Sequence, residues 1–271
     1  MKELRLTQMA RRRRQRRFLT GSGIALVIIV AVVLSATLTG GGGGKSKNAN
    51  PPTTPPKGKH PTTTVSTTTV PPTPSSVPLI AAPAKVGCPS LTNEAKHYTR
   101  FSSPPPMCID PSKQYTAHMV TDVGTITFKL LAAQNPTTVN NFVFLAGYHF
   151  YDGTIFHRVV TGFVDQGGDP LGSGQGGPGY SFNGGAPKAK GFTYHTGDLA
   201  MANSGTPASD GSQFFIVVKD LGSGLSPNYS YFGKVTSGLN VVEKINADGS
   251  ATGQGIPKVV HKILHLTITE S

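Results

Sequence analysis

Short runs of alternating hydrophobic and polar residues fill the chain from Tyr115 onward, and glycines and prolines separate these runs. Alternation with a period of two predicts β-strands, because successive side chains of a strand point to opposite faces. The first two runs, Tyr115–Thr121 and Thr125–Leu131, flank a short turn and predict a hairpin. Further runs predict strands at Thr154–Val159, Phe163–Gln166, Leu199–Met201, Phe214–Val218, Tyr229–Val235 and Val259–Thr269.

Two segments of the same region place apolar residues at helical spacing instead. The first follows Asn135-Pro136, which supplies an N-cap and a proline suited to the first helical position, and it ends near Gly147. The second covers residues 238–246. Together the elements predict a mainly β fold, a closed eight-stranded antiparallel β-barrel capped by two α-helices, since closure leaves no exposed sheet edge.

Residues 18–39 are strongly apolar and carry no charge, which predicts a transmembrane helix ahead of this fold. A helix of this length crosses a bilayer core of roughly 30 Å. Residues 1–17 are basic, so the positive-inside rule predicts a cytoplasmic tail and an extracytoplasmic location for the rest. The alternative is a cleaved signal peptide. A retained anchor is favoured, because no small-x-small cleavage site follows Leu34 and no lipobox cysteine is present.

Residues 40–83 begin with glycines and continue in threonine and proline. This composition cannot bury a core and predicts a disordered linker, which would hold the next domain on the order of 100 Å from the bilayer. A connecting segment, residues 84–109, then leads to a folded domain over residues 110–271. The organisation predicts a single-pass protein of the cell membrane.

The only two cysteines, Cys88 and Cys108, both lie in the connecting segment. Outside the cytoplasm such a pair persists as a disulfide, which predicts a bridge between them. The alternative is two unpaired thiols without catalytic meaning, because no Cys-x-x-Cys motif supports redox chemistry or a zinc site.

The net charge of +12 belongs to the tail and the tether. Residues 1–17 contribute +7 and residues 45–100 contribute +6, whereas residues 109–271 carry −1. A nucleic-acid surface needs basic residues on a folded face, so we expect no nucleic-acid partner.

Two motifs that could indicate a cofactor or a metal lack the context they need. Residues 172–177 match G-x-G-x-x-G, but Pro178-Gly179 follows in place of a helix. His261 and His265 have the spacing of helical metal ligands but lie in a β-branched segment. We expect neither a cofactor nor a metal. The absence of a Gly-x-Ser-x-Gly motif argues against a hydrolase.

Arginine is scarce after the tail, and the predicted folded domain contains only Arg158. It lies in an apolar strand, either as an ion-pair partner or as a functional guanidinium. The segments that follow favour the functional interpretation. They are GFVDQGGD at 162–169, MANS at 201–204, GSQFF at 211–215 and YFGKV at 231–235.

With these segments in order, the sequence resembles the cyclophilin family of peptidyl-prolyl cis-trans isomerases. The resemblance rests on FHRVVTGFVDQGGDP, YHTGDLAMANSGTPASDGSQFFIV and YSYFGKV, and it covers roughly residues 115–270. The loops GSGQGGPGYSF and LSPNYSYFG are similar to the bacterial branch, so with the predicted anchor we expect a bacterial membrane-anchored form.

The resemblance implies a site in which Arg158 is catalytic and the preceding His157 is structural. Val164 stands where a methionine is common, and Gly224 stands roughly where the family has a tryptophan. Binding of the family's cyclic peptide inhibitor depends on that tryptophan, so the departure bears on inhibition more than on turnover. The implied substrate-binding residues are Phe163, Val164, Gln166, Ala202, Asn203, Ser204, Gln213, Phe215, Leu225 and Tyr229.

The implied activity is rotation of X-Pro peptide bonds in proline-containing polypeptides outside the cytoplasm, in support of their folding, by a monomer. The first alternative is a catalytically weak, membrane-tethered chaperone or scaffold that binds proline peptides. The second alternative, an adhesive all-β surface protein, fits the tether but leaves Arg158, Gln166 and Phe215 unexplained.

Overall fold

The computed structural model describes residues 76–91, 96–252 and 254–271. The predicted tail, the predicted transmembrane helix at 18–39 and most of the predicted linker lie outside these ranges. None of the helices in the described ranges is both long enough and apolar enough to span a bilayer.

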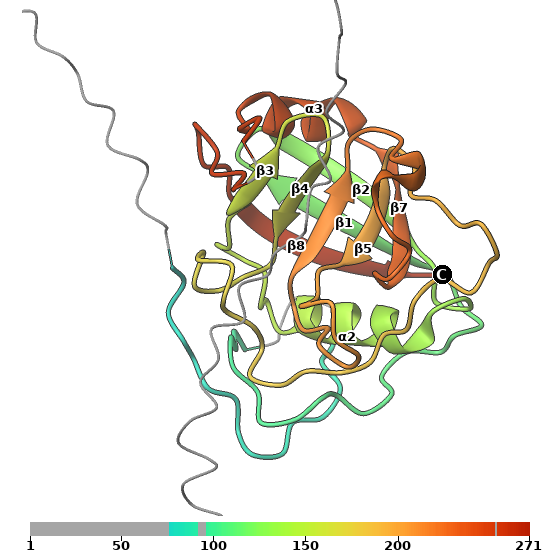
Figure 1. The fold of residues 1–271 in the computed structure, drawn as a ribbon. Helices are drawn as coiled ribbons and strands as arrows, with labels where there is room; N and C mark the ends of the chain where they lie inside the picture. Colours follow the sequence, from blue (N-terminus) through green and yellow to red (C-terminus); the bar gives the residue numbers. More distant parts are fainter. Residues whose placement is uncertain (1–75, 92–95, 253) are drawn as a thin grey trace, which may run out of the picture.

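One antiparallel sheet of eight strands organises the described domain (Figure 1). The hairpin predicted at its start is confirmed, with Thr121 paired to Gly124 across a two-residue turn. The strand order is β3-β4-β6-β5-β7-β2-β1-β8. The strands are β1 Tyr115–Thr121, β2 Gly124–Leu130, β3 Arg158–Val160, β4 Val164–Gly167, β5 Asp198–Met201, β6 Phe214–Val217, β7 Tyr231–Ser237 and β8 Ile263–Glu270.

The prediction of a closed barrel is wrong, because the sheet is an open half-barrel with β3 and β8 at its edges. An isolated bridge between Ile155 and Lys262 and a few backbone hydrogen bonds, such as that from the Phe156 N–H to the His261 carbonyl at 3.0 Å, connect the segments that precede these two strands. Of the predicted strand Thr154–Val159 only Arg158 and Val159 lie in β3, and the predicted start of β8 moves from Val259 to Ile263. Gly255 and Pro257 interrupt the segment before β8, so a continuous ladder cannot form there.

Two helices lie at opposite ends of the sheet, as predicted (Figure 1). Helix α2 spans Pro136–Gly147, and the Asn135 side chain accepts a hydrogen bond from the Thr138 backbone N–H at 3.4 Å. Helix α3 spans Leu239–Ala247, and a 3-10 turn, η1, spans Gly222–Gly224.

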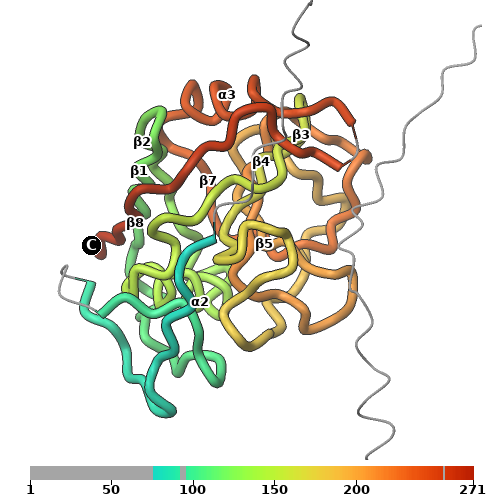
Figure 2. Tube along the Cα trace, turned by 90° about the vertical axis from the view of Figure 1, so that its left-hand side faces the viewer, coloured from blue at the N-terminus to red at the C-terminus, as the bar shows by residue number. Residues whose placement is uncertain are grey.

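Helix α2 is buried on nearly all of its faces, although a helix beside a sheet normally leaves one face in water. Residues 76–91 and 96–110, which we call the extension, cover its outer face (Figure 2). Phe101 is 4% exposed and lies 5.0 Å from Phe144, measured between ring centroids. The Asn140 side chain accepts from the Cys108 N–H at 2.6 Å. The extension is therefore part of the folded domain, including residues 76–83 from the predicted linker.

Cys88 and Cys108 form a disulfide within the extension, with their Cα atoms 5.3 Å apart. The bridge encloses Tyr98 and Phe101, whose rings contact Tyr148 directly after α2. It thus restricts the part of the extension that makes the aromatic contacts.

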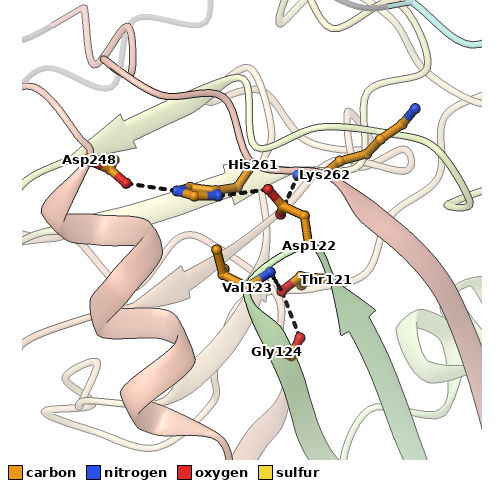
Figure 3. Close-up of polar contacts among 7 residues, drawn as sticks. All are labelled: Thr121, Asp122, Val123, Gly124, Asp248, His261 and Lys262. Atoms are coloured by element: carbon orange, nitrogen blue, oxygen red, sulfur yellow. Dashed lines mark hydrogen bonds and ion pairs between the residues drawn. The ribbon is translucent and has the colours of Figure 1, made fainter.

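His261 links the turn between β1 and β2 to the end of α3 (Figure 3). Its Nδ1 lies 3.1 Å from a carboxylate oxygen of Asp122, in the β1–β2 turn, and its Nε2 lies 3.0 Å from one of Asp248, at the end of α3. His265 contacts a different carboxylate, that of Asp152, at 3.1 Å. The two histidines therefore have separate carboxylate partners.

Asn246, near the end of α3, fixes the turn between β3 and β4. Its amide nitrogen donates to the Asp165 carboxylate at 2.7 Å and to the Val160 carbonyl at 3.0 Å, and its oxygen accepts from the Gly162 N–H at 2.8 Å. Asp165 is fully buried, and its second carboxylate oxygen has no hydrogen-bond partner. Burial raises the pKa of Asp165 to about 7.

Loss of the disulfide is expected to destabilise the protein. In the double variant Cys88→Ser/Cys108→Ser, the free energy of unfolding should fall by about 3 kcal/mol, because a bridge across a loop of this size restricts the unfolded chain. Urea unfolding followed by circular dichroism measures the difference. Reductant should lower the stability of the wild type and leave the double variant unchanged, whereas equal stability of the two proteins would contradict the prediction.

Asp165 is expected to make stability fall as pH rises. The folded state keeps its proton up to about pH 7, whereas the unfolded state releases it near pH 4, so the stability is present below pH 4 and is lost as pH rises through 7. The effect between pH 5 and pH 8 is at most about 3 kcal/mol. Urea unfolding at both pH values should show a smaller decline for Asp165→Asn, and identical declines would rule this role out.

Candidate active site

Arg158 begins β3, where its side chain is half-buried. The strand pairing places it directly opposite Gln166 on β4, and its guanidinium donates to the Gln166 side-chain oxygen at 3.5 Å. Burial lowers the pKa of Arg158. Within the described ranges no carboxylate forms an ion pair with it, which removes the structural ion pair as an explanation.

Two glutamine side chains connect Arg158 to the rest of the fold. The Gln166 amide nitrogen donates to the Gln213 side-chain oxygen at 3.0 Å. The Gln213 amide nitrogen donates in turn to the carbonyls of Gly174, at 3.0 Å, and Gly176, at 2.9 Å. A side-chain amide has a nitrogen that donates and an oxygen that accepts. Because the Gln166 nitrogen donates to Gln213, its oxygen faces the guanidinium.

A small apolar cluster, separate from the main core, lies beside this chain of amides. It contains six of the predicted substrate-binding residues: Phe163, Val164, Ala202, Phe215, Leu225 and Tyr229. Sequence reasoning missed its other members, Tyr194, Ala200, Val217, Phe192, Leu221 and Tyr231. The period of two in β5 and β6 could have identified two of these, because Ala200 alternates with Ala202 and Val217 with Phe215.

Tyr194 holds the rim of the apolar cluster. Its hydroxyl donates to the Tyr229 carbonyl at 2.6 Å and accepts from the Tyr229 N–H at 3.0 Å. The Tyr229 ring meets the buried Phe215 ring edge to face, with 5.4 Å between centroids. Burial raises the pKa of Tyr229, and the charge of nearby Arg158 opposes that rise. Tyr229 therefore connects the apolar cluster to the guanidinium.

The remaining predicted residues lie on the loop after β5. The Asn203 side chain donates to the Asn228 carbonyl at 3.2 Å and to the Asp210 carboxylate at 3.3 Å, which fixes the loop next to Tyr229. Ser204 is exposed, and its hydrogen bonds stay within its own loop. The structure thus brings Asn203, but not Ser204, into contact with the segment that carries Tyr229.

The sequence singles out three further positions, His157, Val164 and Gly224. Burial lowers the pKa of His157 to about 4, so its imidazole is neutral at pH 7 and adds no second charge. Val164 is 1% exposed within the apolar cluster. Gly224 ends η1, directly before the buried Leu225.

Comparisons with known proteins show to which family the chain belongs. Residues 116–268 match the family described as cyclophilin type peptidyl-prolyl cis-trans isomerase/CLD. The chain is 42% identical over 153 residues to peptidyl-prolyl cis-trans isomerase B of Streptomyces anulatus, covering 50% of this chain and 86% of that protein. It is 43% identical over 128 residues to the Bacillus subtilis protein of the same name, covering 47% and 87%.

A solved structure shows the same relationship. A cyclophilin type peptidyl-prolyl cis-trans isomerase of Cryptosporidium parvum, crystallised in the presence of the dipeptide Ala-Pro, superposes with a TM-score of 0.50 at 33% identity. The superposition covers 58% of this chain and 99% of that one. The family match spans more than half of the chain and includes the whole site from Arg158 to Tyr229. This chain therefore belongs to the family of cyclophilin-type peptidyl-prolyl cis-trans isomerases.

Proposed function

We propose that this isomerase uses Arg158 to catalyse rotation about X-Pro peptide bonds. We also propose that it acts outside the cytoplasm while anchored to the membrane. One observation carries the first part of the proposal. A half-buried guanidinium, aligned by Gln166 and without a carboxylate partner in the described chain, lies beside an apolar cluster of the right character for a proline ring.

The reaction breaks no covalent bond, so differential binding alone must supply the catalysis. Rotation about a peptide bond meets a barrier of about 18–20 kcal/mol, because the nitrogen lone pair is delocalised into the carbonyl. The enzyme must therefore bind the twisted amide more tightly than either planar isomer. In the twisted amide the nitrogen regains its lone pair, and the Arg158 guanidinium donates to it while remaining charged at physiological pH.

The apolar cluster has the complementary task of holding the proline ring. Phe163 and Phe215 would contact the pyrrolidine, with Val164, Ala202 and Leu225 beneath it. Gln166, Gln213 and the backbone near Asn203 would anchor the peptide, so that one end of the bond rotates against a fixed other end. Proline-containing polypeptides are the substrate class, and the crystallisation of the Cryptosporidium protein in the presence of Ala-Pro supports this assignment.

The location rests on the sequence before residue 76. Residues 18–39 would span the bilayer, with residues 1–17 in the cytoplasm and the isomerase domain outside. The disulfide between Cys88 and Cys108 is consistent with an oxidising compartment. Newly exported proteins would be the clients, because X-Pro isomerisation limits folding there too. We propose that the protein acts as a monomer.

Arg158→Ala is expected to reduce kcat/KM at least about tenfold, since a donor used only in the transition state is lost. Arg158→Lys should restore little, because lysine lacks the planar fork that meets both Gln166 and the substrate. A protease-coupled assay of a proline peptide measures the rates, and circular dichroism checks the fold. Retention of wild-type kcat/KM by Arg158→Ala would remove this residue from its role.

The proposed orientation predicts that added protease reaches the C-terminal end of the chain but not the N-terminal end. In spheroplasts, an epitope tag placed after Ser271 should be digested by added protease, whereas a tag placed before Met1 should be digested only after lysis. The opposite pattern, or protection of both tags until lysis, would contradict the proposed topology.

A further inference from the structure

The extension, residues 76–91 and 96–110, lies outside the segment that matches the family, yet it touches the loop that holds the active-site glutamines. We call residues 169–179 the glycine loop, because five of its eleven residues are glycine. This loop lies between the extension on one side and Gln213 on the other.

The contact between the extension and the glycine loop is made by backbone hydrogen bonds. The Val77 N–H donates to the Pro170 carbonyl at 2.9 Å, and the Phe101 N–H donates to the Pro178 carbonyl at 2.7 Å. Gly179 packs so closely here that a Cβ atom would collide with the Phe101 carbonyl oxygen. Both ends of the glycine loop are therefore tied to the extension.

Internal contacts make the glycine loop a stiff connection between its two sides. The Asp169 carboxylate accepts from the N–H groups of Leu171 at 2.7 Å, Ser173 at 2.9 Å and Gly174 at 2.6 Å. A Cβ atom at Gly176 would collide with the same carboxylate. A displacement of one end of the loop is thus transmitted to the carbonyls in its middle.

Those carbonyls, of Gly174 and Gly176, are the acceptors of the Gln213 amide. Three successive hydrogen-bonding steps then lead from the loop through Gln213 and Gln166 to Arg158. Because catalysis requires the reacting groups to be held within a fraction of an ångström, a shift of these carbonyls changes the rate without altering the site's composition.

We propose that the extension is a positioning element for Arg158. By holding the glycine loop from outside, it fixes the rotamer of Gln213 and, through Gln166, the direction of the guanidinium. The aromatic contacts of Phe101 with Phe144 and Tyr148 anchor the extension on α2, and its disulfide closes the loop that contains Phe101. The proposal rests on the isomerase function proposed for this site.

A pair of glycine substitutions in the full-length chain tests the proposal. Gly179→Ala disturbs the contact with Phe101, because the site has φ +97° and no room for a Cβ atom. Gly177→Ala is the matched control, since its Cβ atom would meet nothing within 4 Å. We expect Gly179→Ala to lower kcat by about tenfold with little change in KM, and Gly177→Ala to retain wild-type kcat.

A double-mutant cycle with Gln213→Ala separates positioning from general destabilisation. Once Gln213→Ala has cut the connection, Gly179→Ala should lower kcat by less than about twofold further. Equal losses in both backgrounds, or wild-type kcat for Gly179→Ala alone, would overturn the proposal. If the wild type itself failed to turn over the peptide, the proposed function would fall together with this inference.

A second pair of variants decides the question if Gly179→Ala does not fold. Val77→Pro removes the N–H that donates to the Pro170 carbonyl together with the valine side chain, whereas Val77→Ala removes the side chain and retains the N–H. The proline variant should lower kcat and the alanine variant should not. Equal kcat values for these two proteins would overturn the proposal.

Discussion

The proposed catalysis depends on one cross-strand pair, Arg158 on β3 and Gln166 on β4. A guanidinium in a half-buried strand loses hydration, so it needs fixed acceptors or a partner charge. Here the partner is a neutral amide, which orients the guanidinium without neutralising it. The positive charge therefore remains available to a substrate. The glutamine chain, the apolar cluster and Asn246, which fixes the β3–β4 turn, all serve to keep this pair in place.

Much of the fold follows from local patterns. The alternation at Tyr115–Thr121 and the Asn135-Pro136 start of α2 each reflect steric and hydrogen-bonding preferences of neighbouring residues, and both are found where the pattern predicts. Local patterns could not show whether the barrel closes, because closure depends on whether two distant edge strands, β3 and β8, pair with each other. The sequence shows Gly255 and Pro257 before β8, but it does not show that β3 lies opposite them.

The site shows the same division between what local sequence reveals and what it does not. Scarcity of arginine and the surrounding motifs point to Arg158, and the resemblance points to six of the twelve residues of the apolar cluster. Tyr194 and the extension could not be predicted in this way. Tyr194 acts on Tyr229, which lies 35 residues further along the chain, and the extension acts through backbone hydrogen bonds, which carry no residue signature. Both are consequences of the tertiary fold.

The central claim is that Arg158 favours the rotating amide rather than the bound peptide. Nuclear magnetic resonance exchange spectroscopy of a proline peptide separates these two effects, because it measures on-enzyme cis–trans exchange and affinity in one sample. The account predicts that Arg158→Ala binds the peptide with nearly unchanged Kd while exchange slows at least about tenfold. Unchanged exchange, or slower exchange explained entirely by a weaker Kd, would contradict it.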